Sequence, residues 1–260
     1  MPKIHGKHTQ VLVGPYDPSN WFNNAEQSGE RDLAESTGFR PPGDNKQYVA
    51  GHRDSTLSLS GQFDGSPDRV DEILDAQLSD DLSEVVTWSP EGLDVGKRAR
   101  MLYVWGASYG VTAPLEDVVS ISVDLQNDGA VGLGPLIRSS NEPALAFDDS
   151  PLETDPQDLD DPPEDANEDP IWHGALIHLH VPSNTLDEPI DIIVQHAADD
   201  TLGPWVDLQT FTVPAGELYA ARVQLPRGTE IDRYVRVYAD PTDSTEGSVT
   251  FAAVAARLQA

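Results

Sequence analysis

The clearest pattern of hydrophobic and polar positions is an alternating segment that leads directly into a helical one, within residues 54–78. In its first part, apolar residues such as Leu57, Leu59 and Phe63 stand at every second position, between serine, threonine and glutamine. Successive side chains of a strand point to opposite faces. The pattern therefore predicts a strand with one apolar face and one hydroxyl-rich face.

The residues after Asp64 and Gly65 predict one short amphipathic helix. Ser66 is the expected N-cap, and Pro67 is expected at the first helical position, where its missing N–H does no harm. Apolar residues then recur at helical spacing; they are Val70, Ile73, Leu74 and Leu78. This stripe predicts packing against a sheet, although a surface helix between two strands gives the same pattern in any α+β domain.

The rest of the chain predicts mainly strands and turns. In the first half we expect strands over residues 9–13, 56–63, 85–88, 99–111 and 118–127. In the second half we expect six, over residues 175–181, 190–194, 205–213, 218–225, 233–238 and 248–256. Short, closely spaced strands of this kind are typical of a β-sandwich or jelly roll.

Residues 14–53 predict a long loop rich in Gly, Asn, Asp and Pro between the first two strands. Loops of this length are uncommon inside compact domains and often carry a function or an interface. Trp21, Phe22, Phe39 and Tyr48 are expected to anchor it, either on the domain's own core or on another subunit.

Changes of composition divide the sequence into three parts. Residues 1–138 and residues 171–260 each predict a β domain. Residues 139–170 lie between them and include the stretch 148–169, which holds 11 acidic residues and no basic one. Since this part lacks the apolar residues needed to pack, we expect an exposed acidic, proline-rich linker or loop.

The charge of the whole chain is strongly negative, with 45 acidic residues against 16 lysines and arginines. The acidic stretch holds only 11 of the 45, so the excess extends over the folded parts. Such a charge opposes compact and assembled states unless salt screens it. We expect adaptation to high salt, as in halophilic microbes or their viruses, with an ordinary acidic cytosolic protein as the alternative. Direct binding of nucleic-acid phosphates is not expected.

Several classes of protein are excluded by what the sequence lacks. With no cysteine, it offers neither disulfides nor cysteine-based metal or redox sites. The first ten residues contain no apolar stretch typical of a secretory signal, and no apolar run is long enough to span a bilayer. We expect a soluble protein without a cofactor and without a membrane partner.

One serine motif matches a catalytic pattern. Residues 106–110, GASYG, fit the G-x-S-x-G of a hydrolase nucleophile elbow around Ser108. That chemistry needs a sharp turn from a strand into a helix. The residues that follow, Val-Thr-Ala-Pro, begin a helix poorly, so we interpret the glycines as strand-end or bulge residues and expect no enzyme.

Two histidines are the candidates for a metal site. His178 and His180 lie two apart on a predicted strand and so face the same side, opposite Ile177 and Leu179. With His173 or His196 they would suit zinc or a similar ion. The alternative is a pair of polar residues on the solvent or interface face of the strand, and we expect no defined metal site.

Several segments of the first half follow one another in a characteristic order. They are MPKIHGKHTQVLV, YDPSNWFNNAEQSGERDLAESTGF, YVAGHRDSTLSLSGQFDG, DRVDEILDAQL, VVTWSPEGLDVGKRARML and APLEDVVSISVDLQNDGAVGLG. This series resembles the major tail tube proteins of long-tailed, siphovirus-like bacteriophages and related archaeal tailed viruses. In the second half, HGALIHLHV, VQHAADDTLGPWVDLQTFTV, DRYVRVYAD and VTFAAVAARL resemble the second half of longer members. The resemblance covers most of the chain except the acidic part, through structural rather than catalytic residues.

The resemblance implies a mainly β fold, a tail-tube-type β-sandwich or rolled sheet with one flanking α-helix, followed by a C-terminal β-sandwich. The residues expected to mark this fold are Leu57, Leu59, Phe63, Val70, Ile73 and Leu74. In the family, the long loop after the first strand reaches the adjacent ring. Residues 32–48 are therefore the expected stacking segment, with Asp32, Phe39, Arg40 and Tyr48 as candidate interface residues.

The resemblance also implies a structural virion protein that polymerises as stacked rings into the tube conducting the viral genome to the host. Its main partner would be itself, in hexameric rings, or in trimeric rings if the second half is a diverged tube domain. Tail terminator, tail tip and tape-measure proteins are further expected partners, and genomic DNA only in transit. The expected location is the virion tail, assembled in the host cytoplasm.

A different class remains open, a capsid decoration or carbohydrate-binding virion protein built on the C-terminal sandwich. Aromatic residues would then stack on sugars, although burial in a core is the commoner role of such side chains. The candidates are Trp172, Trp205, Tyr219 and Tyr238.

Overall fold

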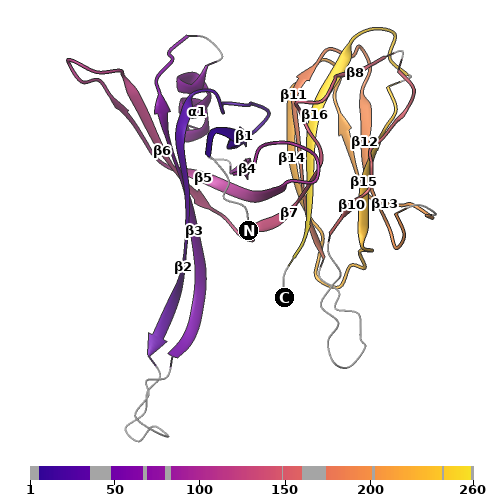
Figure 1. Ribbon diagram of the computed structural model, residues 1–260, viewed down its shortest axis with the longest axis horizontal. Helices are drawn as coiled ribbons and strands as arrows, with labels where there is room; N and C mark the ends of the chain where they lie inside the picture. The colour runs from indigo at the N-terminus through magenta and orange to yellow at the C-terminus, as the bar shows by residue number, and fades with distance from the viewer. Residues whose placement is uncertain are drawn as a thin grey trace, which may run out of the picture. The chain divides into compact units, whose positions relative to one another are not determined.

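The computed structural model describes residues 6–35, 48–66, 69–79, 83–147, 149–159, 174–200, 203–241 and 243–258. The described chain is mainly β, with antiparallel sheets and one short α-helix, which confirms the predicted fold class (Figure 1). None of its helices is both long and apolar enough to cross a membrane.

The chain forms two compact units whose segments alternate along the sequence. The first unit comprises Met1–Asn20, Glu84–Tyr103 and Gly129–Ala260, and the second comprises Trp21–Ser83 and Val104–Asp128. These units do not coincide with the predicted parts 1–138, 139–170 and 171–260, because the second unit is built from two segments inserted into the first.

The first unit contains two antiparallel sheets that share a core. Ile177 and Phe251 come to this core from one sheet, and Ile192 and Phe211 come from the other. The first sheet contains β14 (Tyr219–Gln224), β11 (Ala175–Asn184), β16 (Ser248–Arg257) and β7 (Gly132–Arg138). The second, five-stranded sheet contains β10 (Gln157–Asp158), β15 (Tyr234–Ala239), β12 (Ile190–Ala197), β13 (Val206–Val213) and β9 (Leu152–Glu153).

A second core in the first unit covers the other side of β16. β1 (Gln10–Val13) pairs with β4 (Glu84–Ser89), and β4 pairs with β5 (Arg98–Thr112). Leu12 and Met101 from these strands pack with Ala252 and Val254 of β16. Phe251 and every second residue after it, Ala253 and Ala255, pack in the first core. β16 is therefore buried on both faces, which suits its run of small alanines.

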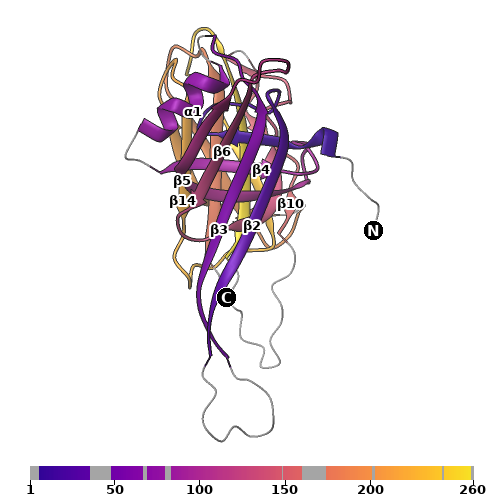
Figure 2. The same ribbon diagram turned by 90° about the vertical axis from the view of Figure 1, so that its left-hand side faces the viewer.

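The second unit is an antiparallel sheet in the order β5–β6–β3–β2, joined by the helix α1 (Val70–Ser79). β5 contributes its Val104–Thr112 portion, which pairs with β6 (Ser120–Asn127). β6 pairs with β3 (Tyr48–Gln62), and β3 pairs with β2 (Phe22–Glu35). Figure 2 shows β2 and β3 continuing well beyond the other strands.

The apolar face of this sheet is buried together with α1. Leu57, Leu59, Val70, Ile73 and Leu74 are all buried, and so are the alternate β6 residues Ile121, Val123 and Leu125. The Tyr109 hydroxyl, on the same side of β5 as Val123 of β6, donates a hydrogen bond to the carboxylate of Asp71 on the helix. Phe63 follows the end of β3 and is partly exposed.

The helix begins later than the sequence indicated. α1 starts at Val70, and Pro67 and Asp68 lie outside the described residues. Ser66 donates its backbone N–H to the Asp64 side chain at 3.1 Å, so Asp64 organises the turn before the helix. This hydrogen bond is also the main reason why the pKa of Asp64 is lowered.

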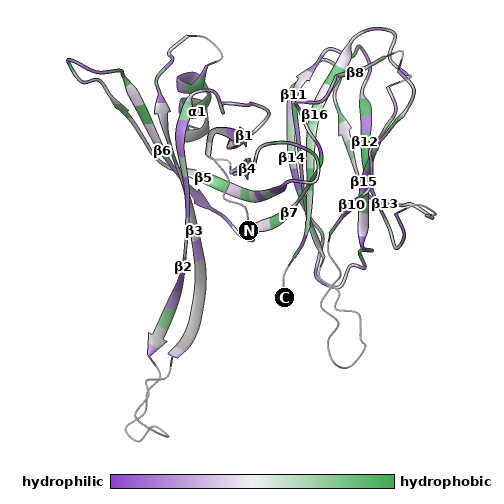
Figure 3. Cartoon of the chain, in the orientation of Figure 1, coloured by the Kyte–Doolittle hydropathy of each residue, from purple (hydrophilic) through white to green (hydrophobic). Residues whose placement is uncertain are grey.

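The predicted long loop over residues 14–53 is wrong for most of its described residues, and residues 36–47 lie outside the described chain. β2 covers Phe22–Glu35, and β3 begins at Tyr48, so a long hairpin takes the place of the loop. Nearly every described residue of β2 is exposed or only half-buried. Because neither face is covered, the strand lacks the apolar alternation that sequence analysis relies on, and Figure 3 shows β2 mostly in hydrophilic colours.

The prediction of an exposed linker is wrong for residues 145–159. Here β8 (Leu145–Ala146) pairs with β16, while β9 and β10 pair with β15. Leu145 is buried in the main core, against which Leu152 and Leu159 also pack. A few well-spaced apolar residues thus suffice to pack this part of the acidic stretch against the core. Residues 160–170 lie outside the described chain.

Gly61 gives a test of the close packing between β3 and the chain before β2. A Cβ added at Gly61 would lie 2.0 Å from the Trp21 carbonyl oxygen, which accepts a 2.8 Å hydrogen bond from the Gln62 N–H. We expect Gly61→Ala to lower the free energy of unfolding by about 1–3 kcal/mol, because the backbone must move apart.

The matched control for this prediction is Gly29→Ala on β2. The nearest atom to a Cβ there is the Asp54 carbonyl oxygen at 3.8 Å, an ordinary contact. Its effect in urea unfolding should stay within about 0.5 kcal/mol. Equal effects of the two substitutions would contradict the proposed close approach.

Candidate assembly surface

The sheet of the second unit has one continuous polar side. Residues directly opposite in an antiparallel pair project to the same side, so the register defines the members of this side. We call it the polar face; it comprises Asn24, Glu26, Ser28, Glu30, Asp54, Thr56, Ser58, Ser60, Gln62, Ser108, Gly110, Thr112, Ser120, Ser122, Asp124 and Gln126. It includes four carboxylates and neither lysine nor arginine, and Trp105 continues the same side along β5.

Asp124 lies at the centre of a hydrogen-bond network that crosses the polar face. The Ser58 hydroxyl on β3 donates to Asp124 Oδ1 at 2.7 Å, and the Ser108 hydroxyl on β5 donates to Oδ2 at 2.8 Å. These two bonds lower the pKa of Asp124. Nearby, Thr56 donates to Gln126 Oε1 at 3.0 Å, and Gln126 donates to the carboxylate of Asp54. The polar face is therefore an ordered and negatively charged surface.

The hairpin of β2 and β3 extends past the third strand as a two-stranded ribbon. β6 pairs with β3 only from Thr56 to Gln62, so the β3 residues before Thr56 have β2 as their one recorded neighbour. Two-stranded ribbons are marginally stable by themselves. At the far end of this ribbon Leu33 is 62% exposed and Tyr48 is 53% exposed. The ribbon thus presents apolar side chains without a covering layer among the described residues.

β2 is also the terminal strand of its sheet. It is 14 residues long and, in the described part of the chain, pairs with β3 alone. An unpaired strand of this length offers a row of backbone N–H and C=O groups to another chain. Its acidic side chains, such as Glu26 and Glu30, disfavour indiscriminate pairing with like-charged copies in dilute salt.

The predicted interface residues fall on this ribbon and on the segment that joins its strands. Asp32 is exposed on β2, beside a bulge between Arg31 and Leu33, and Tyr48 opposes Glu35 at the last recorded pair of the hairpin. Phe39 and Arg40 lie outside the described residues. Leu33 lies inside the predicted stacking segment 32–48 but was not singled out, and the strands of the ribbon were missed because they were interpreted as a loop.

Ser108 of the G-x-S-x-G match lies on the extended strand β5. The β5–β6 register shifts between Gly106 and Ser108, so a β-bulge occupies the motif, as the sequence interpretation held. The Ser108 hydroxyl donates to a carboxylate, Asp124, and the motif does not form the strand-to-helix turn of a nucleophile elbow.

His178 and His180 lie in the interior of the first unit. Both are fully buried, because β11, like β16, is covered on both faces, and the alternative of a polar pair on the solvent or interface face of the strand is wrong. Thr87 of β4 lies between them, with Oγ1 2.8 Å from His180 Nε2 and 3.1 Å from His178 Nδ1. His180 Nδ1 lies 2.7 Å from the Gly14 carbonyl oxygen.

This chain of contacts determines the direction of each hydrogen bond. Gly14 can only accept, so His180 Nδ1 carries the proton and its Nε2 accepts from the Thr87 hydroxyl. Thr87 Oγ1 then accepts from His178 Nδ1–H. Burial lowers the pKa of His180 to about 4 and the pKa of His178 well below its usual value. Both histidines are therefore neutral near pH 7.

The same contacts bear on the metal candidates. Both nitrogens of His180 are used, and of the four ring nitrogens of this pair only His178 Nε2 is buried without a hydrogen-bond partner. His196 lies apart, with Nδ1 3.1 Å from the Asp232 carboxylate, and His173 lies outside the described residues. Within the described chain no group of three or more metal-ligating side chains was found.

No protein-family model and no curated protein matches the chain. Among solved structures, it is similar to a chain of the virion of a native gene transfer agent particle, at 15% identity over 50% of this chain and 98% of that one, with a TM-score of 0.43. It is also similar to the SPP1 tail tube, at 14% identity over 49% and 77% of the two chains, with a TM-score of 0.40.

A third similar structure is the Dit protein of SPP1, described as a paradigm of the hub adsorption apparatus in phages infecting Gram-positive hosts. It matches at 10% identity over 97% of this chain and 100% of that one, with a TM-score of 0.36. These similar structures are thus mostly components of phage tails and related tubes. Their TM-scores are all below 0.5, so no function is inferred from them.

The buried histidines predict a loss of stability in mild acid. Since the folded pKa of His180 is about 4 and the unfolded value is about 6.5, the unfolded chain binds more protons between these two pH values. Stability is fully present above about pH 6.5 and falls as the pH is lowered towards 4. We expect His180 to contribute a loss of about 2 kcal/mol between pH 7 and 5.

Urea unfolding at constant salt, repeated at pH 7, 6 and 5, measures this loss. His180→Gln is the matched control, because an amide still donates and accepts hydrogen bonds but does not titrate. It should remove about 2 kcal/mol of the pH dependence. A variant with the same pH dependence as the parent would show that His180 does not resist protonation in the folded state.

Proposed function

We propose that this protein is a structural virion subunit that assembles as stacked rings into a viral tail tube through which the genome reaches the host. The observation that carries the proposal is the sheet of the second unit. It combines a helix-covered apolar face, an ordered acidic polar face, a free edge strand and a projecting ribbon. A sheet with these four features is suited to joining copies of itself.

The polar face would line the lumen of the tube. Its carboxylates, including the hydrogen-bonded Asp124, would repel DNA phosphates, and its serine and threonine hydroxyls would stay hydrated. A genome could then move past without binding, since binding DNA requires the neutralisation of phosphates by lysine and arginine. The absence of lysine and arginine from the polar face supports this assignment.

The free edge of β2 would close the ring. Pairing with the margin of the neighbouring subunit's sheet would satisfy its backbone groups and remove an edge that is otherwise open to aggregation. At the opposite margin of the sheet lies the Val104–Thr112 portion of β5, whose recorded partner is β6. Its outer side would receive β2 of the neighbouring subunit. Repetition of one such heterologous contact produces a closed ring when the rotation per subunit divides a full turn.

The ribbon of β2 and β3 would carry the contact between rings. Its exposed Leu33 and Tyr48 need a covering surface, and a second ring provides one. Asp32, Phe39, Arg40 and Tyr48 stay the candidate stacking residues predicted from the sequence, to which the ribbon adds Leu33.

Six chains per ring are favoured over three. A trimer would need a second tube-like half in the C-terminal part, with its own helix and long hairpin. The described residues after Arg138 form a sandwich of strands with no α-helix, and the longest of those strands has 10 residues. This favours one tube unit per chain, with the sandwich outside the lumen.

The remaining parts of the proposal concern the setting of the tube. Tail terminator, tail tip and tape-measure proteins would be its partners, and the virion tail, assembled in the host cytoplasm, its location. The host would be halophilic, because a net charge of −29 repels neighbouring copies over distances that molar salt reduces to a few ångströms.

Negative-stain microscopy of the purified protein in molar salt tests the function. We expect stacked rings or tubes with a central hole and six-fold end-on averages. Leu33→Ser should abolish stacking while leaving the monomer's unfolding midpoint unchanged, since Leu33 is exposed. Leu218→Ser, which alters an exposed leucine of the first unit, should leave stacking intact. Monomers at every salt concentration would contradict the proposal and favour a capsid decoration or binding protein.

Adaptation to salt has its own test, a series of thermal melts of the monomeric protein from dilute to 3 M potassium chloride. We expect the midpoint to rise continuously, because screening relieves repulsion among 45 acidic residues. Leu33→Ser in the same series separates this effect from assembly. A midpoint independent of salt would show that the acidic surface is not an adaptation to salt.

A further inference from the structure

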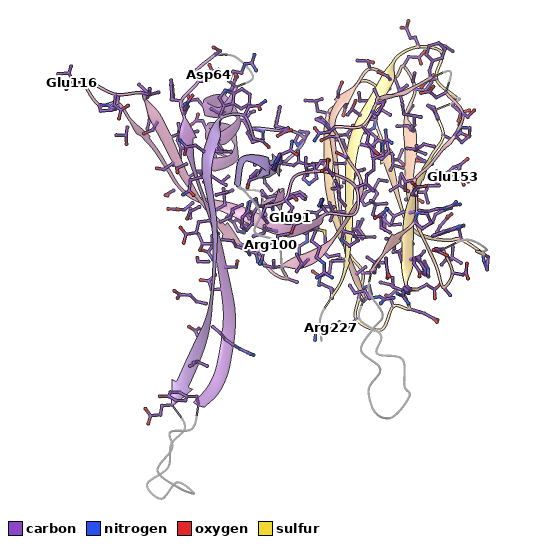
Figure 4. All side chains as sticks on the ribbon, in the orientation of Figure 1. Asp64, Glu91, Arg100, Glu116, Glu153 and Arg227 are labelled. Carbon is purple, nitrogen blue, oxygen red and sulfur yellow. The ribbon has the colours of Figure 1, made fainter. Side chains whose placement is uncertain are left out.

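The outer side of the five-stranded sheet carries an ordered group of side chains outside the proposed assembly surface. Alternation along its strands turns Leu152, Val194 and Val237 into the core. Their neighbours face the other way, and Figure 4 shows Glu153 on the side of the sheet away from β11 and β16. We define the Trp205 cluster as Glu153, Gln195, Trp205, Asp207 and Arg236.

Arg236 is the centre of the Trp205 cluster. Its Nε donates to Gln195 Oε1 at 2.9 Å, and an η nitrogen donates to Glu153 Oε2 at 2.7 Å. Gln195 in turn donates from Nε2 to Asp207 Oδ1 at 2.8 Å. The members come from four strands or their ends, so the sheet itself fixes their spacing.

The indole of Trp205 covers the guanidinium of Arg236. The Arg236 Cζ atom lies 4.4 Å from the ring centre, which places the guanidinium against the face of the ring. Only 15% of the Arg236 side chain is exposed, whereas Glu153 is 54% exposed. Trp205 is itself half-buried, so part of its indole remains accessible next to Glu153.

An indole face beside fixed carboxylate and amide groups matches the surface of a sugar ring. A pyranose has one face of C–H groups, which packs on an aromatic ring, and an equatorial belt of hydroxyls that both donate and accept. Glu153 and Asp207 supply acceptors, and hydrogen bonds already hold both carboxylates in place, so little side-chain freedom is lost on binding.

The charge of the cluster selects among sugars. The cluster contains two carboxylates and one guanidinium; the guanidinium is already paired with Glu153, and Asp207 accepts from Gln195. The balance is negative, so sulfated or uronic-acid sugars would be repelled, whereas neutral ones would not. Of the other aromatic candidates, Tyr219 packs against the main core and Trp172 lies outside the described residues. Tyr238 lies on the same side of β15 as Arg236, two residues away.

We propose that the Trp205 cluster is a binding site for neutral hexopyranose units of a polysaccharide, with one sugar ring stacked on Trp205. The site belongs to the first unit, and its binding does not depend on the assembly of the second unit into a tube.

The test uses the full chain in molar salt and measures quenching of tryptophan fluorescence and thermophoresis with dextran, mannan and galactan, and with alginate as the acidic comparison. We expect at least one neutral polymer to bind and alginate not to bind. Trp205→Ala should weaken binding at least tenfold and remove the quenching. Trp105→Ala, at a tryptophan 41% exposed on the second unit, should change neither.

Asp207→Ala keeps the proposal testable if Trp205→Ala fails to fold, because Asp207 is exposed and contacts Gln195 from the edge of the cluster. We expect it to weaken binding at least threefold with an unchanged unfolding midpoint. The proposal is overturned if none of the neutral polymers binds, if alginate binds more tightly, or if Trp105→Ala weakens binding as much as Trp205→Ala.

Discussion

The register between β3 and β6 is the constraint on which the second unit depends. Within seven consecutive pairs, from Thr56–Gln126 to Gln62–Ser120, every apolar residue lies on one side and every hydroxyl or carboxylate on the other. A slip by one residue would expose Leu57 and Leu59 and bury Ser58 and Asp124. The burial of α1, the network around Asp124 and the polar face all follow from this one alignment.

The parts that could be predicted from the sequence are those in which one face of an element is buried and the other is not. The alternation at Leu57 and Leu59, the stripe at Val70, Ile73 and Leu74, and the C-terminal strands β12 and β15 have this character, and the structure agrees with them. The fold class followed from these elements. The helix start was less predictable, because Asp64 rather than Ser66 organises the preceding turn.

Where sequence analysis went wrong, this contrast between a buried and an exposed face is missing, for two opposite reasons. β2 is covered on neither side, so its sequence shows no alternation of apolar and polar residues. β11 is covered on both, so His178 and His180 occupy buried positions that alternation assigned to a solvent or interface face. β7 was missed because its glycines look like turn residues; a Cβ at Gly134 would lie 1.9 Å from the Ala255 carbonyl oxygen, so the approach of β16 requires glycine. The polar face could be predicted only as a row of hydroxyls along residues 56–62. The hydrogen bonds that order it join residues on different strands, far apart in the sequence.

The central position of β16 has a consequence for the order of folding. It follows every other described strand in the chain, yet it pairs with both β11 and β7 and is buried on both faces. Strands synthesised earlier, including β1 and β4 at the start of the first unit, have no complete core to pack on until β16 arrives. Non-local pairing of this kind is slow and leaves apolar surface exposed meanwhile. The abundant negative charge would keep such unfinished chains apart during that interval.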